Sequence, residues 1–131
     1  MRLLLDTQIW LWALVASGRL GRRTRQALTD SGNDVYLSAA SSWEIAIKYT
    51  LGKLPLPAPP ERYVPERIRL SGVTPLAIEH SHALAVATLP ELHRDPFDRL
   101  LIAQAVVERM TLVTADSAMT AYDLPLLDAT E

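Results

Sequence analysis

Short apolar runs alternate with amphipathic segments along the first half of the chain. The apolar run at residues 1–5 predicts a buried strand, and apolar positions three to four residues apart predict the helices that follow. The first predicted elements are a strand that ends at Asp6 and a helix with Ile9, Trp10, Ala13 and Leu14 on one side. A second helix runs through Leu20, Thr24, Ala27 and Leu28 and ends at residues 31–33. A strand at residues 34–38 follows, and then a helix through residues 43–49 that ends near Gly52.

The second half begins with a proline-rich segment, residues 55–60, which cannot form the interior of a helix and is predicted to be a loop within the domain. Asp95 and Pro96 open a strong helix, because proline is favoured at the first helical position, and its apolar residues 100–107 predict that it is central and buried. The other predicted elements are helices at residues 63–70 and 78–89, an extended piece at residues 73–76, a strand at residues 111–114, and a short edge strand at Leu126 and Leu127.

Strands that alternate with helices predict an α/β fold, in which a central parallel sheet of four to five strands is flanked by helices on both faces. With 131 residues and 49% hydrophobic content, the chain has the size and apolar content of one compact domain, residues 1–131.

Composition and charge narrow the class of protein. The absence of cysteine excludes disulfides and thiolate metal sites, and no apolar run has the roughly 20 residues that span a bilayer, so we expect a cytoplasmic protein without a membrane anchor. The net charge of -2 does not favour general binding of nucleic acid, so any basic surface must be local.

Four acidic residues fall at predicted helix starts: Asp6, Glu44, Asp98 and Asp116. Each has a structural explanation when taken alone. Asp6 can cap the first helix, Glu44 can form a capping box with Ser41 or an ion pair with Lys48, and Asp98 suits the helix dipole. Asp116 can cap a short helix or form an Asx turn. Asp95 is a natural helix cap first and a supporting residue of a site second.

Capping does not explain why four acids should meet at one edge of one sheet, which is where parallel α/β sheets bind ligands. Carboxylates brought close together repel one another and oppose folding unless a cation neutralises them. Oxygen ligands without cysteine or paired histidines favour Mg²⁺ or Mn²⁺, and such ions support the hydrolysis of phosphodiesters.

Four segments, in this order, resemble the PIN domain, and specifically the VapC-type toxins of bacterial and archaeal toxin–antitoxin pairs. They are LLLDT at residues 3–7, SSWEIAIK at 41–48, LPELHRDPFDRLLIAQA at 89–105 and TLVTAD at 111–116, and the resemblance spans nearly the whole chain. It implies that Asp6, Glu44, Asp98 and Asp116 are the catalytic, metal-binding acids, of which the fourth is the most variable in the family, with Thr7 and Thr114 as supporting polar residues.

The resemblance also implies an endoribonuclease that uses Mg²⁺ or Mn²⁺ to hydrolyse RNA and is inhibited when a cognate antitoxin covers the acidic pocket. A homodimer is expected, and operator DNA would be bound through the antitoxin. A catalytically silent binding module with the same fold and a receiver-like signalling domain are the alternatives.

Several basic residues could support the site. Arg94 and Arg99 flank Asp98 and can reach a phosphate or an antitoxin carboxylate, or pair with Asp95. Lys48 either approaches the site or only pairs with Glu44. The arginines at positions 19, 22, 23 and 25 form a basic face for which solvation is the commoner explanation than RNA contact. The three histidines lack the pattern of a catalytic base or metal pair, so no essential role is expected for His93.

Overall fold

Five short parallel strands form the central sheet of the computed structural model, which describes residues 1–131. The strands lie in the order β3-β2-β1-β4-β5, and every neighbouring pair is parallel. Their bounds are β1 Arg2–Leu5, β2 Asp34–Ser38, β3 Thr74–Leu76, β4 Thr111–Thr114 and β5 Leu126–Asp128. The predicted α/β class and the number of strands are therefore confirmed. Receiver-like folds have the order 2-1-3-4-5, so the receiver hypothesis is wrong.

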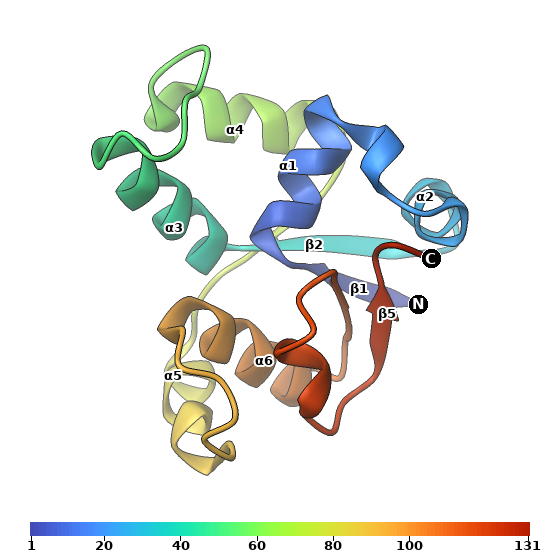
Figure 1. Cartoon of the computed structure of the whole chain (residues 1–131), viewed down its shortest axis with the longest axis vertical. Coiled ribbons are helices and arrows are strands. Elements are labelled where there is room, and N and C mark those ends of the chain that lie inside the picture. Colours follow the sequence, from blue (N-terminus) through green and yellow to red (C-terminus); the bar gives the residue numbers. More distant parts are fainter.

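The helices lie on both faces of this sheet (Figure 1). Their bounds are α1 Thr7–Val15, α2 Arg22–Thr29, α3 Ala39–Thr50, α4 Pro60–Ser71, α5 His80–Ala85 and α6 Pro96–Glu108, with short 3-10 turns at Ser17–Arg19, Val86–Thr88 and Met119–Ala121. No helix combines the length and the apolar character that a membrane crossing requires.

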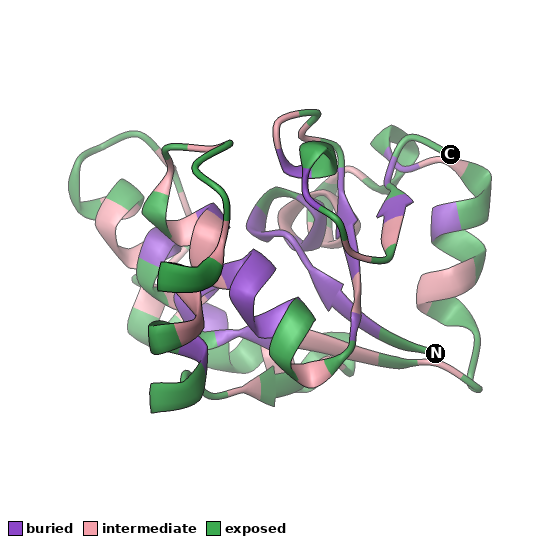
Figure 2. Ribbon diagram, turned by 90° about the horizontal axis from the view of Figure 1, so that it is seen from below, coloured by how far each residue is buried: buried purple, intermediate pink, exposed green.

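The central strand β1 supplies leucines to both faces. Leu3 and Leu5 point into a cluster that includes Ile9 and Trp10 of α1, whereas Leu4 points into a second cluster with Leu101 and Ile102 of α6. All three leucines of β1 are buried, as expected for a central strand that is covered on both sides. Figure 2 shows that buried residues are concentrated on the strands and on the helix faces inside the molecule.

The helix predicted through residues 43–49 differs from the observed one at its start. α3 begins at Ala39, several residues earlier than the apolar pattern indicated, because Ser38 caps it by accepting a hydrogen bond from the Ala40 amide at 2.9 Å. The prediction that α6 is central and buried is confirmed for residues 101–105, which are all buried, whereas Val106 and Val107 near its end are exposed.

The strand ends determine where the site forms. Leu5 of β1 pairs with Val113 of β4, so the residues that follow these two strands leave the sheet at the same edge. Asp6 and Asp116 come from these exits, and α6, packed on the face beneath, begins with Asp98 in its first turn. The edge is therefore built from segments far apart in the sequence.

Replacement of Ile102 by alanine tests the anchoring of α6. Ile102 is fully buried, so Ile102→Ala should lower the free energy of unfolding by about 2–5 kcal/mol in urea denaturation. Val106→Ala on the same helix, where the side chain is exposed, should cost less than about 1 kcal/mol. Equal losses in the two variants would contradict the described packing of α6.

Candidate active site

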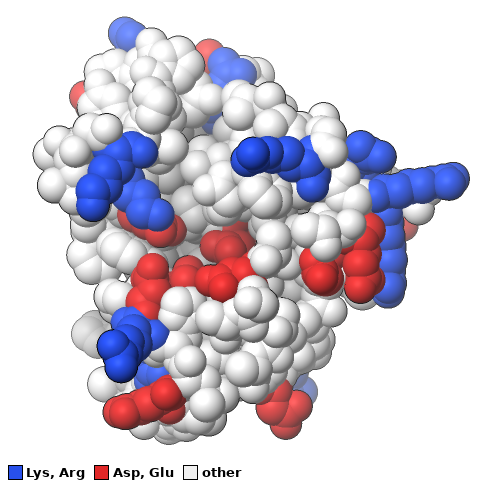
Figure 3. Space-filling view, viewed as in Figure 1, with Lys and Arg blue, Asp and Glu red and all other residues white.

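A cavity of about 480 Å³ opens at the carboxyl edge of the sheet, and all four predicted acids line it. Asp95, Lys48 and Thr7 also line this cavity. Figure 3 shows acidic side chains gathered in a hollow near the middle of the molecule, with Lys and Arg side chains around it. The structure therefore brings together Asp6, Glu44, Asp98 and Asp116.

Asp6 directly follows β1, and its amide donates a hydrogen bond to the Val113 carbonyl at 2.9 Å. Although it occupies the cap position of α1, its side chain makes no capping hydrogen bond, so the capping explanation is wrong. Its carboxylate instead accepts a hydrogen bond of 2.8 Å from the Thr114 hydroxyl. Burial raises the pKa of Asp6 and the nearby Glu44 adds to this rise, while the Thr114 bond opposes it.

The two predicted supporting threonines tie the site together in different ways. The Thr114 hydroxyl donates to Asp6 and accepts a hydrogen bond from the Asp116 amide at 3.0 Å. The Thr7 hydroxyl donates to Ser41 Oγ at 2.8 Å and so links the start of α1 to α3. Thr114 therefore contacts a candidate ligand directly, whereas Thr7 fixes the backbone around one.

Glu44 lies on α3 with its side chain only 7% exposed. Its Oε2 atom forms an ion pair with Lys48 Nζ at 2.8 Å, while its buried Oε1 atom has no hydrogen-bond partner. The hydrogen bond to Glu44 raises the pKa of Lys48. The predicted capping box with Ser41 is wrong, because α3 begins earlier and Ser41 lies inside it. The predicted ion pair between Glu44 and Lys48 is confirmed.

Asp95 and Asp98 have separate roles at the start of α6. Asp95 Oδ1 accepts hydrogen bonds from the Phe97 and Asp98 amides at 2.9 and 3.3 Å, which confirms Asp95 as the helix cap. Asp98 is buried at the third helical position. Its burial raises its pKa to about 7, with further contributions from the charges of Asp6 and Asp95.

Asp116 is the most exposed member of the four acids, with its side chain 39% exposed. Its Oδ1 atom accepts a hydrogen bond from the Ala118 amide at 2.9 Å, which is the predicted Asx turn. Its Oδ2 atom lies 3.3 Å from His93 Nε2. The turn therefore fixes one oxygen and directs the other towards the site.

His93 is the residue that the sequence analysis missed. Its Nε2 atom lies 2.9 Å from Asp98 Oδ2 as well as 3.3 Å from Asp116 Oδ2. The only signal in the sequence is its place in the HRDPFDR segment, five residues before Asp98. No periodicity marks it, because it lies in the loop that precedes α6.

Arg99 was expected to point at the site, but in the structure it does not. It donates hydrogen bonds to the carbonyls of Pro90 and Val86 and to the Tyr122 hydroxyl, at 2.9, 3.1 and 3.2 Å. These bonds brace the loop before α6, so neither a phosphate contact nor a pair with Asp95 is supported for Arg99. Its position one residue after Asp98 rotates it away from the cavity, which Arg99 does not line.

The donor atoms of this cavity suit a divalent cation. The fully buried Oε1 atom of Glu44 lacks a partner, and a buried carboxylate oxygen without one is costly unless a cation or water fills the place. Burial and mutual repulsion raise the pKa values of Asp6 and Asp98, which a bound cation would reverse. Carboxylate oxygens are the ligands that Mg²⁺ and Mn²⁺ prefer.

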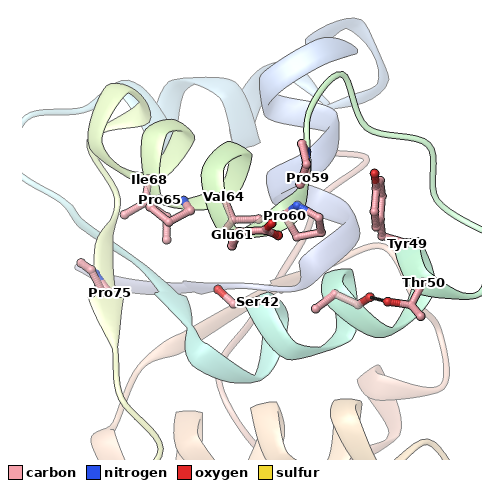
Figure 4. Close-up of a pocket in the computed structure, with 11 residues that line it drawn as sticks. Ser42, Tyr49, Thr50, Pro59, Pro60, Glu61, Val64, Pro65, Ile68 and Pro75 are labelled. Atoms are coloured by element: carbon pink, nitrogen blue, oxygen red, sulfur yellow. Dashed lines mark hydrogen bonds between the residues drawn. The ribbon is translucent and has the colours of Figure 1, made fainter.

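The largest cavity of the protein lies elsewhere and has a different character. It has a volume of about 780 Å³ between α3 and α4, and Figure 4 shows it lined by prolines, Val64 and Ile68. Glu61 is the one acid in its lining, so no set of carboxylates converges there. The smaller acidic cavity is therefore the better candidate for chemistry.

Comparison with known proteins identifies relatives of this chain. The family model described as PIN domain matches residues 3–124. Ribonuclease VapC16 from Mycobacterium tuberculosis is 54% identical over 59 residues, which cover 45% of this chain and 42% of that protein. This relative is therefore matched over less than half of its length.

Solved structures share the fold at low sequence identity. VapBC2 from Rickettsia felis, bound to a DNA fragment from their promoter, aligns with a TM-score of 0.72 at 19% identity over 97% of this chain and 98% of the other. VapBC-1 from nontypeable Haemophilus influenzae aligns with a TM-score of 0.70 at 18% identity over 100% of both chains. These structures support the topology of the sheet and its helices.

The raised pKa of Asp98 predicts a pH dependence of stability in the absence of metal. The folded protein holds this proton more tightly than the unfolded chain, so the contribution of Asp98 to stability is full below pH 3.8 and is lost as the pH rises to about 7. Asp98→Asn should therefore stabilise the metal-free protein increasingly across this range, as measured by unfolding in EDTA. The exposed Asp34→Asn is the control, and a constant difference between wild type and Asp98→Asn would contradict the assignment.

Removal of the Thr114 hydroxyl tests its two hydrogen bonds. Thr114→Val keeps the shape of the side chain but leaves Asp6 and the Asp116 amide without this partner, so the free energy of unfolding should fall by about 1–3 kcal/mol. Thr111→Val, at the less buried start of the same strand, should change it by less than about 0.5 kcal/mol. Urea denaturation of both variants measures the difference, and equal effects would show that the hydroxyl contributes nothing specific.

Proposed function

The chain belongs to the PIN-domain family, and from this premise we propose that it is a Mg²⁺- or Mn²⁺-dependent endoribonuclease, the toxin of a type II toxin–antitoxin pair. The partial match to a ribonuclease VapC supports this activity. The observation that carries the proposal is the single cavity shared by Asp6, Glu44, Asp98 and Asp116, with one buried Glu44 oxygen unpartnered.

In this proposal the four acids supply the ligands for divalent cations, and the surrounding groups keep these acids in place. Thr114 orients Asp6, the Asp95 cap orients the first turn of α6 that carries Asp98, and the Asx turn orients Asp116. The bound cation would supply Lewis-acid stabilisation of the phosphodiester and lower the pKa of a water molecule. The buried setting strengthens these electrostatic effects because water is partly excluded.

The substrate class follows from the charges around the cavity. An acidic cavity repels RNA phosphates unless a cation is bound, so binding of substrate and binding of metal should be coupled. Lys48 and Lys53 both line the cavity and are exposed at its rim, where they can contact the phosphates that flank the scissile bond. The arginines of α2 lie apart from this cavity's lining and carry no part of the proposal.

The proposed partners follow from the same relatives. An antitoxin is expected because the chain resembles VapC-type toxins and shares its fold with the VapBC structures. We further propose that residues 1–131 form one PIN domain, that the protein is a homodimer, and that it acts in the cytoplasm, where an RNA substrate is available.

The nuclease proposal predicts metal-dependent cleavage that requires the acids. Purified wild-type protein incubated with total bacterial RNA should produce discrete fragments with Mg²⁺ or Mn²⁺ and none with EDTA. Asp6→Asn and Asp98→Asn should each lower the cleavage rate by about a thousandfold or more, since metal stabilisation of the transition state is worth several kcal/mol.

The matched control is Glu61→Gln in the proline-lined cavity, which should cleave at the wild-type rate. Circular dichroism would check that each variant is folded. If folded wild type and Asp98→Asn were equally inactive on RNA from several sources, while both bound RNA, the silent binding module would be the better description. Cleavage that persisted in EDTA would contradict metal dependence.

A further inference from the structure

The imidazole of His93 lies between two of the four acids. Its Nε2 atom is 2.9 Å from Asp98 Oδ2 and 3.3 Å from Asp116 Oδ2, and one ligand atom from each residue lies within 4.8 Å of the others. The His93 side chain is only 14% exposed, so this contact is enclosed by the protein. A cation that bridged the Oδ2 atoms of Asp98 and Asp116 would compete with this Nε2 atom for both oxygens.

The hydrogen bonds of the ring identify which nitrogen carries the proton. The Asp95 amide donates to His93 Nδ1 at 3.2 Å, so Nδ1 acts as an acceptor and has no hydrogen of its own. The hydrogen is then on Nε2, which donates to the two carboxylates. A metal ligand needs a free lone pair, so Nε2 in this arrangement is a donor to the acids and not a ligand to a cation.

The loop that carries His93 is held from behind. The His93 amide donates to the Tyr122 hydroxyl oxygen at 2.9 Å, and Arg99 donates to the same oxygen at 3.2 Å. Arg99 also holds the Pro90 carbonyl of this loop at 2.9 Å. The backbone of His93 is therefore held by contacts outside the acidic cavity, in addition to the contacts that its ring makes with Asp95, Asp98 and Asp116.

On the other side of the cavity, one carboxylate oxygen has no donor beside it. Glu44 Oε1 is fully buried and has no partner, although Lys48 occupies the second oxygen of the same carboxylate. Asp6, Glu44 and Asp98 all line this cavity. The structure thus leaves one buried carboxylate oxygen without a partner, while the N–H group of His93 lies between Asp98 and Asp116.

We propose that His93 is a positioning residue that closes the cation position between Asp98 and Asp116. The resting site then binds one divalent cation, at Asp6, Glu44 and Asp98, and binds a second only when the imidazole has moved away. This inference rests on the proposed metal dependence of the site. It gives the HRDPFDR segment a role in limiting the number of bound cations, through a loop that Tyr122 and Arg99 hold in place.

The proposal can be tested without measuring activity. The protein is titrated with Mn²⁺ at one fixed pH, and the free ion is measured by electron paramagnetic resonance. Wild type should bind one Mn²⁺ with high affinity. His93→Ala should bind two, the second about tenfold or more tighter than in wild type, because a charge-assisted hydrogen bond no longer has to be broken. His93→Gln, which retains an N–H donor, should restore the single site. His80→Ala, at an exposed histidine, should match wild type.

A second variant covers the case in which His93→Ala does not fold. Tyr122→Phe removes only the hydroxyl that holds the His93 amide, and it should tighten the second Mn²⁺ in the same direction. Weaker Mn²⁺ binding in His93→Ala would show that His93 is a ligand and would overturn the proposal. An unchanged number of bound Mn²⁺ ions in both His93→Ala and Tyr122→Phe would also overturn it. Asp6→Asn reports on the proposed function separately, because it should abolish the first site whatever His93 does. If no variant bound Mn²⁺, both proposals would fail.

Discussion

The repulsion between carboxylates buried at one edge of the sheet is the constraint on which the rest of the site depends. Desolvation and neighbouring charges disfavour the ionised forms of Asp6 and Asp98, as their raised pKa values show. Each acid accordingly has a donor beside it: Thr114 for Asp6, Lys48 for Glu44, and His93 for both Asp98 and Asp116. These donors offset part of the cost and leave Glu44 Oε1 as the buried oxygen without a partner.

The fold tolerates this cost because the site is attached to a rigid frame. Leu3, Leu4 and Leu5 anchor β1 in two separate apolar clusters, so the residue that follows them cannot move away from its neighbours. The parallel register between β1 and β4 then brings the exits of two strands to one edge. Burial of apolar surface on both faces stabilises an arrangement that the charges alone would open.

The sequence predicted the features that depend on short-range pattern. The strands at residues 34–38 and 111–114 were found from their short apolar runs. The Asp95 cap and the Asx turn at Asp116 were found because turn and cap chemistry acts within a few residues. The roles of His93 and Arg99 were not found, since both depend on Tyr122, more than twenty residues further along the chain. The start of α3 was misplaced because Ser38 and Ser41 are equally good caps by type, and only tertiary packing distinguishes them.

The partners of each carboxylate distinguish helix capping from metal binding. A carboxylate that caps a helix is saturated by backbone amides, as Asp95 Oδ1 is by two of them. Asp6 occupies a cap position but bonds to Thr114, and Glu44 lies in the second turn of α3, beyond the amides that need a cap. Their burial therefore has no explanation in helix capping. A cost of this kind persists in a stable fold when a ligand removes it, which supports the proposal that the acidic cavity binds a cation.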